Sequence, residues 1–240
     1  MALRSVEVDG HKFEIHYDII NPSAQRDIVF LHGWGSNKEI MKNGFGDRFA
    51  DFRHIYIDMP GFGKSPNSLV LTTDKYAQII SVFLDSLNCN RFAIAGHSFG
   101  GKVATLLNPK NLILLSSAGI PQAKELNVKI KIAIFKALKP FGFSTLYRLF
   151  ATKDAKGMPR NMYETLKNVV DEDFSAVFAN YYGKALIFWC KEDTATPLRA
   201  GERIASIITN NVFTPLDGTH YFFLDKSVDV ERVCLDRFSL

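Results

Sequence analysis

The residues Gly96-His97-Ser98-Phe99-Gly100 follow a short apolar run in the sequence. A serine with small residues two places before and after it is typical of a tight turn between a strand and a helix, because larger side chains would collide across the turn. Such a turn exposes the serine hydroxyl. The pattern also occurs by chance, so Ser98 is predicted to be a nucleophile only if a base and an acid accompany it.

Asp193 and His220 are the candidate acid and base. A serine hydroxyl needs a histidine to take its proton and a carboxylate to orient that histidine. Asp193 lies three residues after the apolar run that ends at Cys190, and His220 follows the last apolar run of the chain. Taken singly, Asp193 is also compatible with a helix cap and His220 with an ordinary loop histidine. Together with Ser98 they predict a catalytic triad.

Three other residues are alternatives for these roles. Glu192 precedes Asp193 and is the competing acid, but it lies one place too early and we expect it to be solvated. His97 precedes Ser98, and we expect it to pack or to form a hydrogen bond. His32 begins a tight turn, where we expect a structural role.

An oxyanion formed during acyl transfer needs N–H donors that are already in place. Phe99 follows the serine at the start of a predicted helix, where backbone N–H groups lack partners and the helix dipole favours negative charge. The sequence His32-Gly33-Trp34-Gly35 is the predicted source of the second donor. We expect Trp34 to supply its backbone N–H and to form a pocket wall with its ring, and Gly33 to lie in the same binding loop.

The apolar runs that carry these residues alternate with helical patterns. A hairpin is predicted over 6–19, around Asp9-Gly10. Strands are predicted at 27–31, 52–58, 92–95, 111–117, 185–190 and 211–214. Helices are predicted at 37–49, 73–87, 102–107, from Pro197 onward, and at 228–238. This order predicts an α/β fold with a parallel sheet covered on both faces, whose loops bring Ser98, Asp193 and His220 to one edge.

Residues 120–183 break the alternation, because they show helical patterns without a buried strand. We therefore predict a helical cap over 120–183, inserted into an α/β core formed by 1–119 and 184–240. The first part of the cap, 124–139, alternates over 128–132 like a strand, but its length favours an amphipathic helix.

Composition excludes several classes of protein. The chain has 240 residues, of which 47% are hydrophobic, enough for one α/β domain with an insertion. It has no long apolar run for a membrane span and begins without a signal-peptide core, so we expect a cytoplasmic protein. The three cysteines form no close pair, and we expect no metal. A net charge of +4 argues against nucleic-acid binding.

These residues and blocks resemble the α/β-hydrolase superfamily over essentially the whole chain. The motifs that carry the resemblance are His32-Gly33-Trp34-Gly35-Ser36-Asn37, Asp58-Met59-Pro60-Gly61-Phe62-Gly63-Lys64-Ser65, Gly96-His97-Ser98-Phe99-Gly100-Gly101, the loop of Asp193, and Gly218-Thr219-His220. Within the superfamily, the first two motifs are most similar to those of pimeloyl-acyl-carrier-protein methyl ester esterases of biotin synthesis. Similar blocks occur in general carboxylesterases and in C–C hydrolases that cleave ring-fission products.

The resemblance implies a serine carboxylesterase that works through an acyl-enzyme without a metal or organic cofactor. Residues 121–160 carry nine basic and two acidic side chains, an excess of seven positive charges over the predicted cap. Such a surface attracts acidic partners, and acyl carrier proteins are acidic. We therefore expect a carrier protein to dock there; the alternative is a solvated lysine face. The expected docking residues are Lys124, Lys129, Lys131, Lys136, Lys139 and Arg148.

Overall fold

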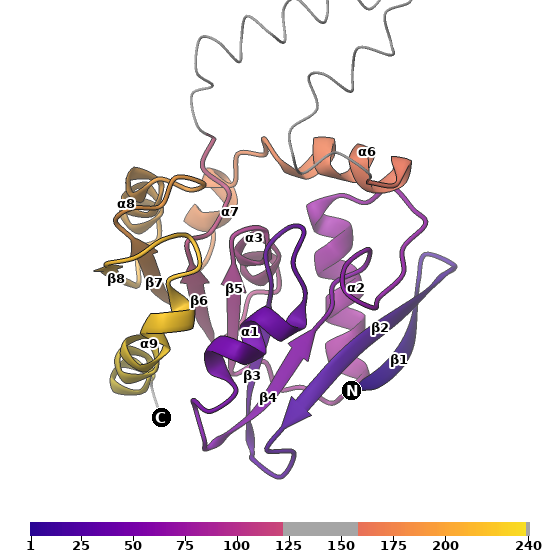
Figure 1. Cartoon of the computed structure of the whole chain (residues 1–240), viewed down its shortest axis with the longest axis horizontal. Coiled ribbons are helices and arrows are strands. Elements are labelled where there is room, and N and C mark those ends of the chain that lie inside the picture. The colour runs from indigo at the N-terminus through magenta and orange to yellow at the C-terminus, as the bar shows by residue number, and fades with distance from the viewer. Residues whose placement is uncertain (122–157, 239–240) are drawn as a thin grey trace, which may run out of the picture.

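The computed structural model describes residues 1–121 and 158–238. Its centre is an eight-stranded sheet with the strand order β1-β2-β4-β3-β5-β6-β7-β8 (Figure 1). β1 pairs with β2 and β2 with β4 in antiparallel fashion, and the other neighbours are parallel. The strands are β1 (Ala2–Val8), β2 (His11–Ile20), β3 (Arg26–Leu31), β4 (Phe52–Ile57), β5 (Ala93–His97), β6 (Asn111–Leu115), β7 (Lys184–Cys190) and β8 (Asn211–Leu216). The mostly parallel sheet confirms the predicted fold class.

The parallel strands are buried on both faces, as their continuous apolar runs predict. Along β3, Ile28 and Phe30 face one hydrophobic cluster, whereas Val29 and Leu31 face the other. The hairpin between β1 and β2 turns at Asp9 and Gly10, whose φ angles of 51° and 74° are those that an Asp-Gly turn requires. The sheet thus separates two cores.

Helices cover both faces of the sheet (Figure 1). Residues of α1 and α9 pack in the cluster with Phe30, and residues of α2, α3 and α8 pack in the cluster with Leu31. The helices are α1 (Lys38–Phe45), α2 (Thr73–Ser86), α3 (Phe99–Leu106), α6 (Arg160–Val169), α7 (Ser175–Ala179), α8 (Leu198–Ile207) and α9 (Phe223–Arg237). α8 begins at Leu198, one residue after the predicted start, and Pro197 is its N-cap residue.

Three helix boundaries differ by three residues or more from the sequence predictions, and one of them is the start of α3, at Phe99 rather than at 102. α9 begins at Phe223 rather than at 228, because a run of tight turns after Thr219 leads directly into the helix. Lys226 interrupts the helix with φ −112°, and the buried position that follows it is the polar Ser227, which weakens the apolar pattern in the sequence. α1 ends at Phe45 rather than at 49, where Phe49 has a positive φ of 47° that a helix cannot continue.

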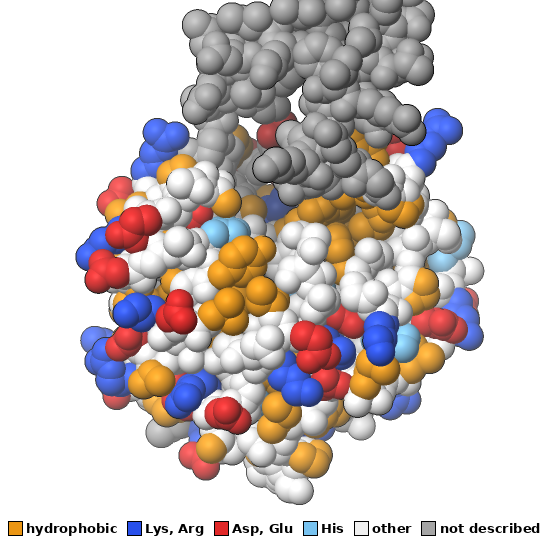
Figure 2. Space-filling view, in the orientation of Figure 1, with side chains coloured by type: hydrophobic (Ala, Val, Ile, Leu, Met, Phe, Trp, Pro, Cys, Tyr) orange, Lys and Arg blue, Asp and Glu red, His pale blue; other side chains and the backbone are white. Residues whose placement is uncertain are grey.

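The predicted cap is described in part. α6 and α7 lie within 120–183, and α6 lies beyond the upper end of the sheet in Figure 1. The cap helix predicted at 124–139 and the basic residues Lys124, Lys129, Lys131, Lys136, Lys139 and Arg148 lie outside the described residues. None of the helices in the described part of the chain is long and apolar enough to cross a membrane. Figure 2 shows acidic and basic side chains interspersed over one face.

A buried lysine ties α3 to the segment that follows α6. Lys102 is only 1% exposed, and its ammonium group donates to the carboxylate of Glu172 at 2.7 Å and to the carbonyl of Val169. The same ammonium lies 5.0 Å from the ring centre of Phe174. Burial lowers the pKa of Lys102, whereas Glu172 opposes that shift. Residues 169–174, which lie within the predicted cap, are therefore held against α3, the helix that follows Ser98.

Candidate active site

Ser98 lies in a sharp turn between β5 and α3. Its φ of 50° and ψ of −114° are unusual for a residue with a side chain. A Cβ at Gly100 would lie 2.5 Å from the carbonyl oxygen of Leu31, and one at Gly96 would collide with the carbonyl of Gly100. Only glycine fits these two positions, so the backbone adopts the turn that the sequence predicts.

Asp193 and His220 are joined by a hydrogen bond. Nδ1 of His220 donates to Oδ2 of Asp193 at 2.8 Å, and Asp193 is only 5% exposed. Oδ1 of Asp193 accepts from the backbone N–H groups of Ala195 and Thr196, each at 2.8 Å. Burial by itself raises the pKa of Asp193, but the hydrogen bonds from His220 and Thr196 outweigh it and hold that pKa well below its usual range. The carboxylate is thus an ionised anchor for the imidazole.

Thr196 is a site residue that the sequence analysis missed. Its hydroxyl donates to Oδ2 of Asp193 at 2.9 Å and lies 3.4 Å from Nδ1 of His220. The available signal was the sequence Asp193-Thr194-Ala195-Thr196, since an aspartate often accepts hydrogen bonds from residues two and three places later. Glu192 instead accepts from the N–H of Gly218 at 2.8 Å and is exposed.

His97 lies between the serine and the histidine. Its Nε2–H donates to the backbone carbonyl of His220 at 3.0 Å, and the two imidazole rings are 4.5 Å apart. Nδ1 of His97 is buried without a hydrogen-bond partner in the described structure. Burial lowers the pKa of His97 to about 3, so the ring is neutral. The expectation that His97 packs and forms a hydrogen bond agrees with this geometry.

The loop after β3 passes directly beside the serine. A Cβ at Gly33 would lie 3.2 Å from Cβ of Ser98 and 2.9 Å from Nδ1 of His97, so a side chain there would displace one of them. The ring of Trp34 lies edge-on against Phe62 and Phe99, at centre distances of 4.8 and 5.6 Å. The indole N–H of Trp34 is buried and, in the described structure, has no hydrogen-bond partner.

The structure therefore groups all of the predicted site residues around one edge of the sheet. Phe99 occupies the first position of α3, where backbone N–H groups have no partner within the helix. Asp193 and His220 are hydrogen-bonded, whereas no hydrogen bond joins the hydroxyl of Ser98 to His220 in the described structure. Nucleophile–base hydrogen bonds are often long without substrate and shorten when it binds.

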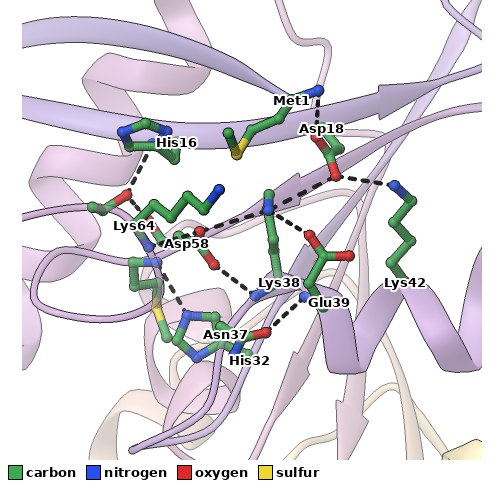
Figure 3. A network of polar contacts seen from close by, with 12 residues as sticks. Met1, His16, Asp18, His32, Asn37, Lys38, Glu39, Lys42, Asp58 and Lys64 are labelled. Atoms are coloured by element: carbon green, nitrogen blue, oxygen red, sulfur yellow. Dashed lines mark hydrogen bonds and ion pairs between the residues drawn. The ribbon is translucent and has the colours of Figure 1, made fainter.

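A network of polar contacts that includes His32 and Asp58 connects the loop after β3 to the loop after β4 (Figure 3). Nδ1–H of His32 donates to the carbonyl of Gly33 at 2.8 Å, and Nε2 of His32 accepts from the N–H of Met59 at 3.1 Å. These bonds fix one tautomer of a neutral imidazole. Burial lowers the pKa of His32 to about 4. His32 thus links the loops that follow β3 and β4 through hydrogen bonds.

Asp58 organises the second of these loops. Oδ1 of Asp58 accepts from the N–H of Lys38 at 2.8 Å, and Oδ2 accepts from the N–H of Lys64 at 3.1 Å. The ammonium group of Lys38 lies 3.7 Å from the same carboxylate (Figure 3). The hydroxyl of Ser65 donates to the carbonyl of Asp58 at 2.6 Å. The charge of Asp58 is therefore compensated by Lys38 at the start of α1 and by backbone N–H groups.

Among the described residues, no group of three or more histidine, cysteine, aspartate or glutamate side chains could hold a metal ion. The chemistry available at this site is that of a serine, a histidine held by a carboxylate, and backbone N–H groups beside them. This set suits nucleophilic attack on a carbonyl carbon with proton transfer by the histidine.

Comparison with known proteins agrees with this fold. The sequence model of the alpha/beta hydrolase family matches residues 28–233. The solved structure of an esterase from Exiguobacterium antarcticum matches with a TM-score of 0.74 at 21% identity, covering 95% of this chain and 96% of that one. At this identity the similarity concerns the fold.

Two curated relatives catalyse different reactions according to their names. The 2-hydroxy-6-oxononadienedioate/2-hydroxy-6-oxononatrienedioate hydrolase of Burkholderia vietnamiensis is 25% identical, over 83% of this chain and 82% of its own length. The 2-succinyl-6-hydroxy-2,4-cyclohexadiene-1-carboxylate synthase of an Enterobacter strain is 32% identical over 77 residues. That second match spans 32% of this chain and only 30% of the relative.

Folding stability should rise with pH between about 4 and 6.5 through His32. Its pKa falls from 6.5 to about 4 on folding, so the unfolded chain binds more protons in this window and acid favours unfolding. Replacing His32 with Asn should reduce the slope of the unfolding free energy against pH by up to about 1.4 kcal/mol per pH unit. Urea unfolding across this pH range measures the slope.

The exposed residue His11 provides the matched control, since His11→Asn removes a histidine outside the network. An unchanged slope in His32→Asn would contradict a neutral, buried His32.

Proposed function

Because this chain belongs to the alpha/beta hydrolase family, we propose that it is a serine carboxylesterase that hydrolyses a carboxylic ester through an acyl-enzyme. The observation that carries the proposal is the 2.8 Å hydrogen bond between Asp193 and His220, beside the turn that presents Ser98. An imidazole held in this way is prepared to accept a proton from a serine hydroxyl.

In the proposed mechanism, His220 removes the proton of Ser98 as the serine oxygen attacks the ester carbonyl. Asp193 holds the imidazole in position and stabilises its cationic form. The backbone N–H groups of Phe99 and Trp34 bind the oxyanion, and each such donor is worth roughly 3 to 4 kcal/mol. His220 then protonates the leaving alcohol, and a water molecule activated by His220 releases the acid from Ser98.

Replacement of Ser98 by Ala should abolish ester hydrolysis and labelling by a fluorophosphonate. Asp193→Asn should lower kcat about 10⁴-fold, because the amide no longer holds the imidazole in the required tautomer. A p-nitrophenyl ester series measures both effects. Glu192→Gln is the matched control, since it changes the adjacent carboxylate, which is exposed and bonded to Gly218. Full activity in Ser98→Ala, or equal losses in Asp193→Asn and Glu192→Gln, would refute the assigned roles.

For the substrate, we propose the methyl ester of an acyl chain on an acidic carrier protein, such as pimeloyl-acyl carrier protein. The support is the excess of seven positive charges over 121–160 and the resemblance of the first two motifs to esterases of biotin synthesis. Electrostatic attraction of this kind raises association rates and is weakened by salt. A role in biotin synthesis in the cytoplasm would follow from this substrate.

Charge reversal at Lys129, Lys131 and Lys136 to Glu should lower kcat/KM for a carrier-linked methyl ester at least about tenfold at low salt. Hydrolysis of a small p-nitrophenyl ester should stay unchanged. A control variant reverses three lysines of the described part of the chain, Lys12, Lys75 and Lys191. Its net charge therefore equals that of the first charge-reversal variant. Equal losses on both substrates would exclude the carrier, leaving a general short-chain carboxylesterase.

A second candidate is a C–C hydrolase of the meta-cleavage product type, and a cavity favours it. The cavity has a volume of about 560 Å³ and lies against the loop after β3, since Gly35 lines it. Its lining residues include the apolar Phe62, Met158 and Met162 and the basic residue Lys64. No acidic side chain is among its described lining residues. Such a cavity suits an apolar chain that ends in a carboxylate, and the relative from Burkholderia acts on a dioate by its name.

Lys64 is placed to bind that carboxylate. Its backbone is held by Asp58, whose charge already faces Lys38, and its own ammonium group forms no ion pair within the described structure (Figure 3). Lys64→Met should lower kcat/KM for a vinylogous diketone diacid about tenfold, with little change for a neutral ester. Lys12→Met is the control for net charge. Failure of the wild-type protein to cleave the diketone diacid excludes this candidate.

A further inference from the structure

We infer that His97 is a positioning residue for the proposed general base, acting on His220 through its backbone carbonyl. The inference rests on the proposed function, because it assigns His97 a task in the step that His220 performs. It concerns a residue that neither touches the substrate nor takes part in proton transfer.

Two contacts of His97 are with the residue that it would position, and two more are with the turn that follows that residue. Its Nε2–H donates to the carbonyl oxygen of His220 at 3.0 Å, and its ring lies 4.5 Å from the ring of His220. The rings of Tyr221 and Phe223 each lie 5.0 Å from it. One side chain at the end of β5 therefore holds both the backbone and the ring of His220, as well as the turn that leads into α9.

The place of His97 in the sequence makes this contact a link between the two reacting residues. His97 is the last residue of β5, and Ser98 follows it in the turn. The loop of His220 follows β8, which is separated from β5 by β6 and β7 in the sheet. Without His97, the position of His220 relative to Ser98 would depend on longer connections through the sheet.

The ring must be neutral to fill this position. A carbonyl oxygen only accepts, so Nε2 of His97 carries a proton. A second proton, on Nδ1, would be buried without an acceptor in the described structure, so Nδ1 keeps its lone pair. Nδ1 is buried without a partner in the described structure, against the backbone of Gly33. When His220 accepts a proton during the reaction, a second charged imidazole 4.5 Å away would oppose it. A neutral His97 supplies the hydrogen bond without that repulsion.

Two variants separate the hydrogen bond from simple packing. His97→Phe keeps an aromatic ring but has no donor, whereas His97→Gln places an amide N–H at a similar distance from the backbone. We expect His97→Phe to lower kcat about tenfold to a hundredfold with little change in KM. The reason is that a general base displaced by about 1 Å can lower the rate of the chemical step by about this factor. We expect His97→Gln to recover most of that loss.

A spectroscopic measurement tests the position of His220 directly. The low-field proton resonance of the Asp193–His220 hydrogen bond should persist in His97→Gln and broaden or move in His97→Phe. Titration of active sites with a fluorophosphonate gives kcat per competent site, so that misfolded protein is not counted. The inference is overturned if His97→Phe keeps kcat per site and the resonance, or if His97→Gln is as impaired as His97→Phe.

The proposed function and this inference fail in different ways. If the wild-type protein hydrolyses no ester and Ser98 takes no fluorophosphonate, the proposed function is wrong. The resonance of the Asp193–His220 hydrogen bond still tests whether His97 fixes His220 in that case.

Discussion

The site depends on close contacts between backbone segments around Ser98, which leave no room for side chains at Gly96 and Gly100. Gly96 lies against the carbonyl of Gly100, and Gly100 lies against the carbonyl of Leu31 at the end of β3. These approaches bring the start of α3 into contact with the loop after β3, and they hold Ser98 at a positive φ of 50°. Such strain persists only where the surroundings over-determine the conformation. The sheet supplies that constraint, because β5 is paired on both sides, with β3 and β6.

Buried histidines support this turn without contributing charge. Burial lowers the pKa of His32 and His97, so both remain neutral and act through fixed donors and acceptors. His32 joins the loops after β3 and β4, and His97 joins β5 to the loop of His220. His220 differs from them, because its side chain is 17% exposed and its Nδ1 bonds to a carboxylate. The surroundings of these buried imidazoles therefore differ from those of His220, for which we propose proton transfer.

Much of this arrangement follows from local sequence patterns. Apolar runs identify the parallel strands, and glycine spacing identifies the turn at Ser98, because both depend on neighbouring residues. The start of α9 at Phe223 was not predictable in this way, since the next buried position of the helix is the polar Ser227. The contacts of Thr196 with His220 and of Lys102 with Glu172 were also missed. They join segments that are distant in sequence, and their partners are set by the folded sheet.

A comparison of Asp58 with Asp193 explains why the local sequence pattern alone does not show which aspartate is the acidic residue of the predicted triad. Each follows a parallel strand, each is nearly buried, and each carboxylate accepts hydrogen bonds from two backbone N–H groups. The two carboxylates differ in the side chain that each one faces. Asp58 faces the ammonium of Lys38 and forms part of a loop, whereas Asp193 holds the imidazole of His220. A lysine fixes charge, while a histidine exchanges protons near neutral pH. The same local arrangement therefore holds a loop at one strand end and the proposed catalytic histidine at the other.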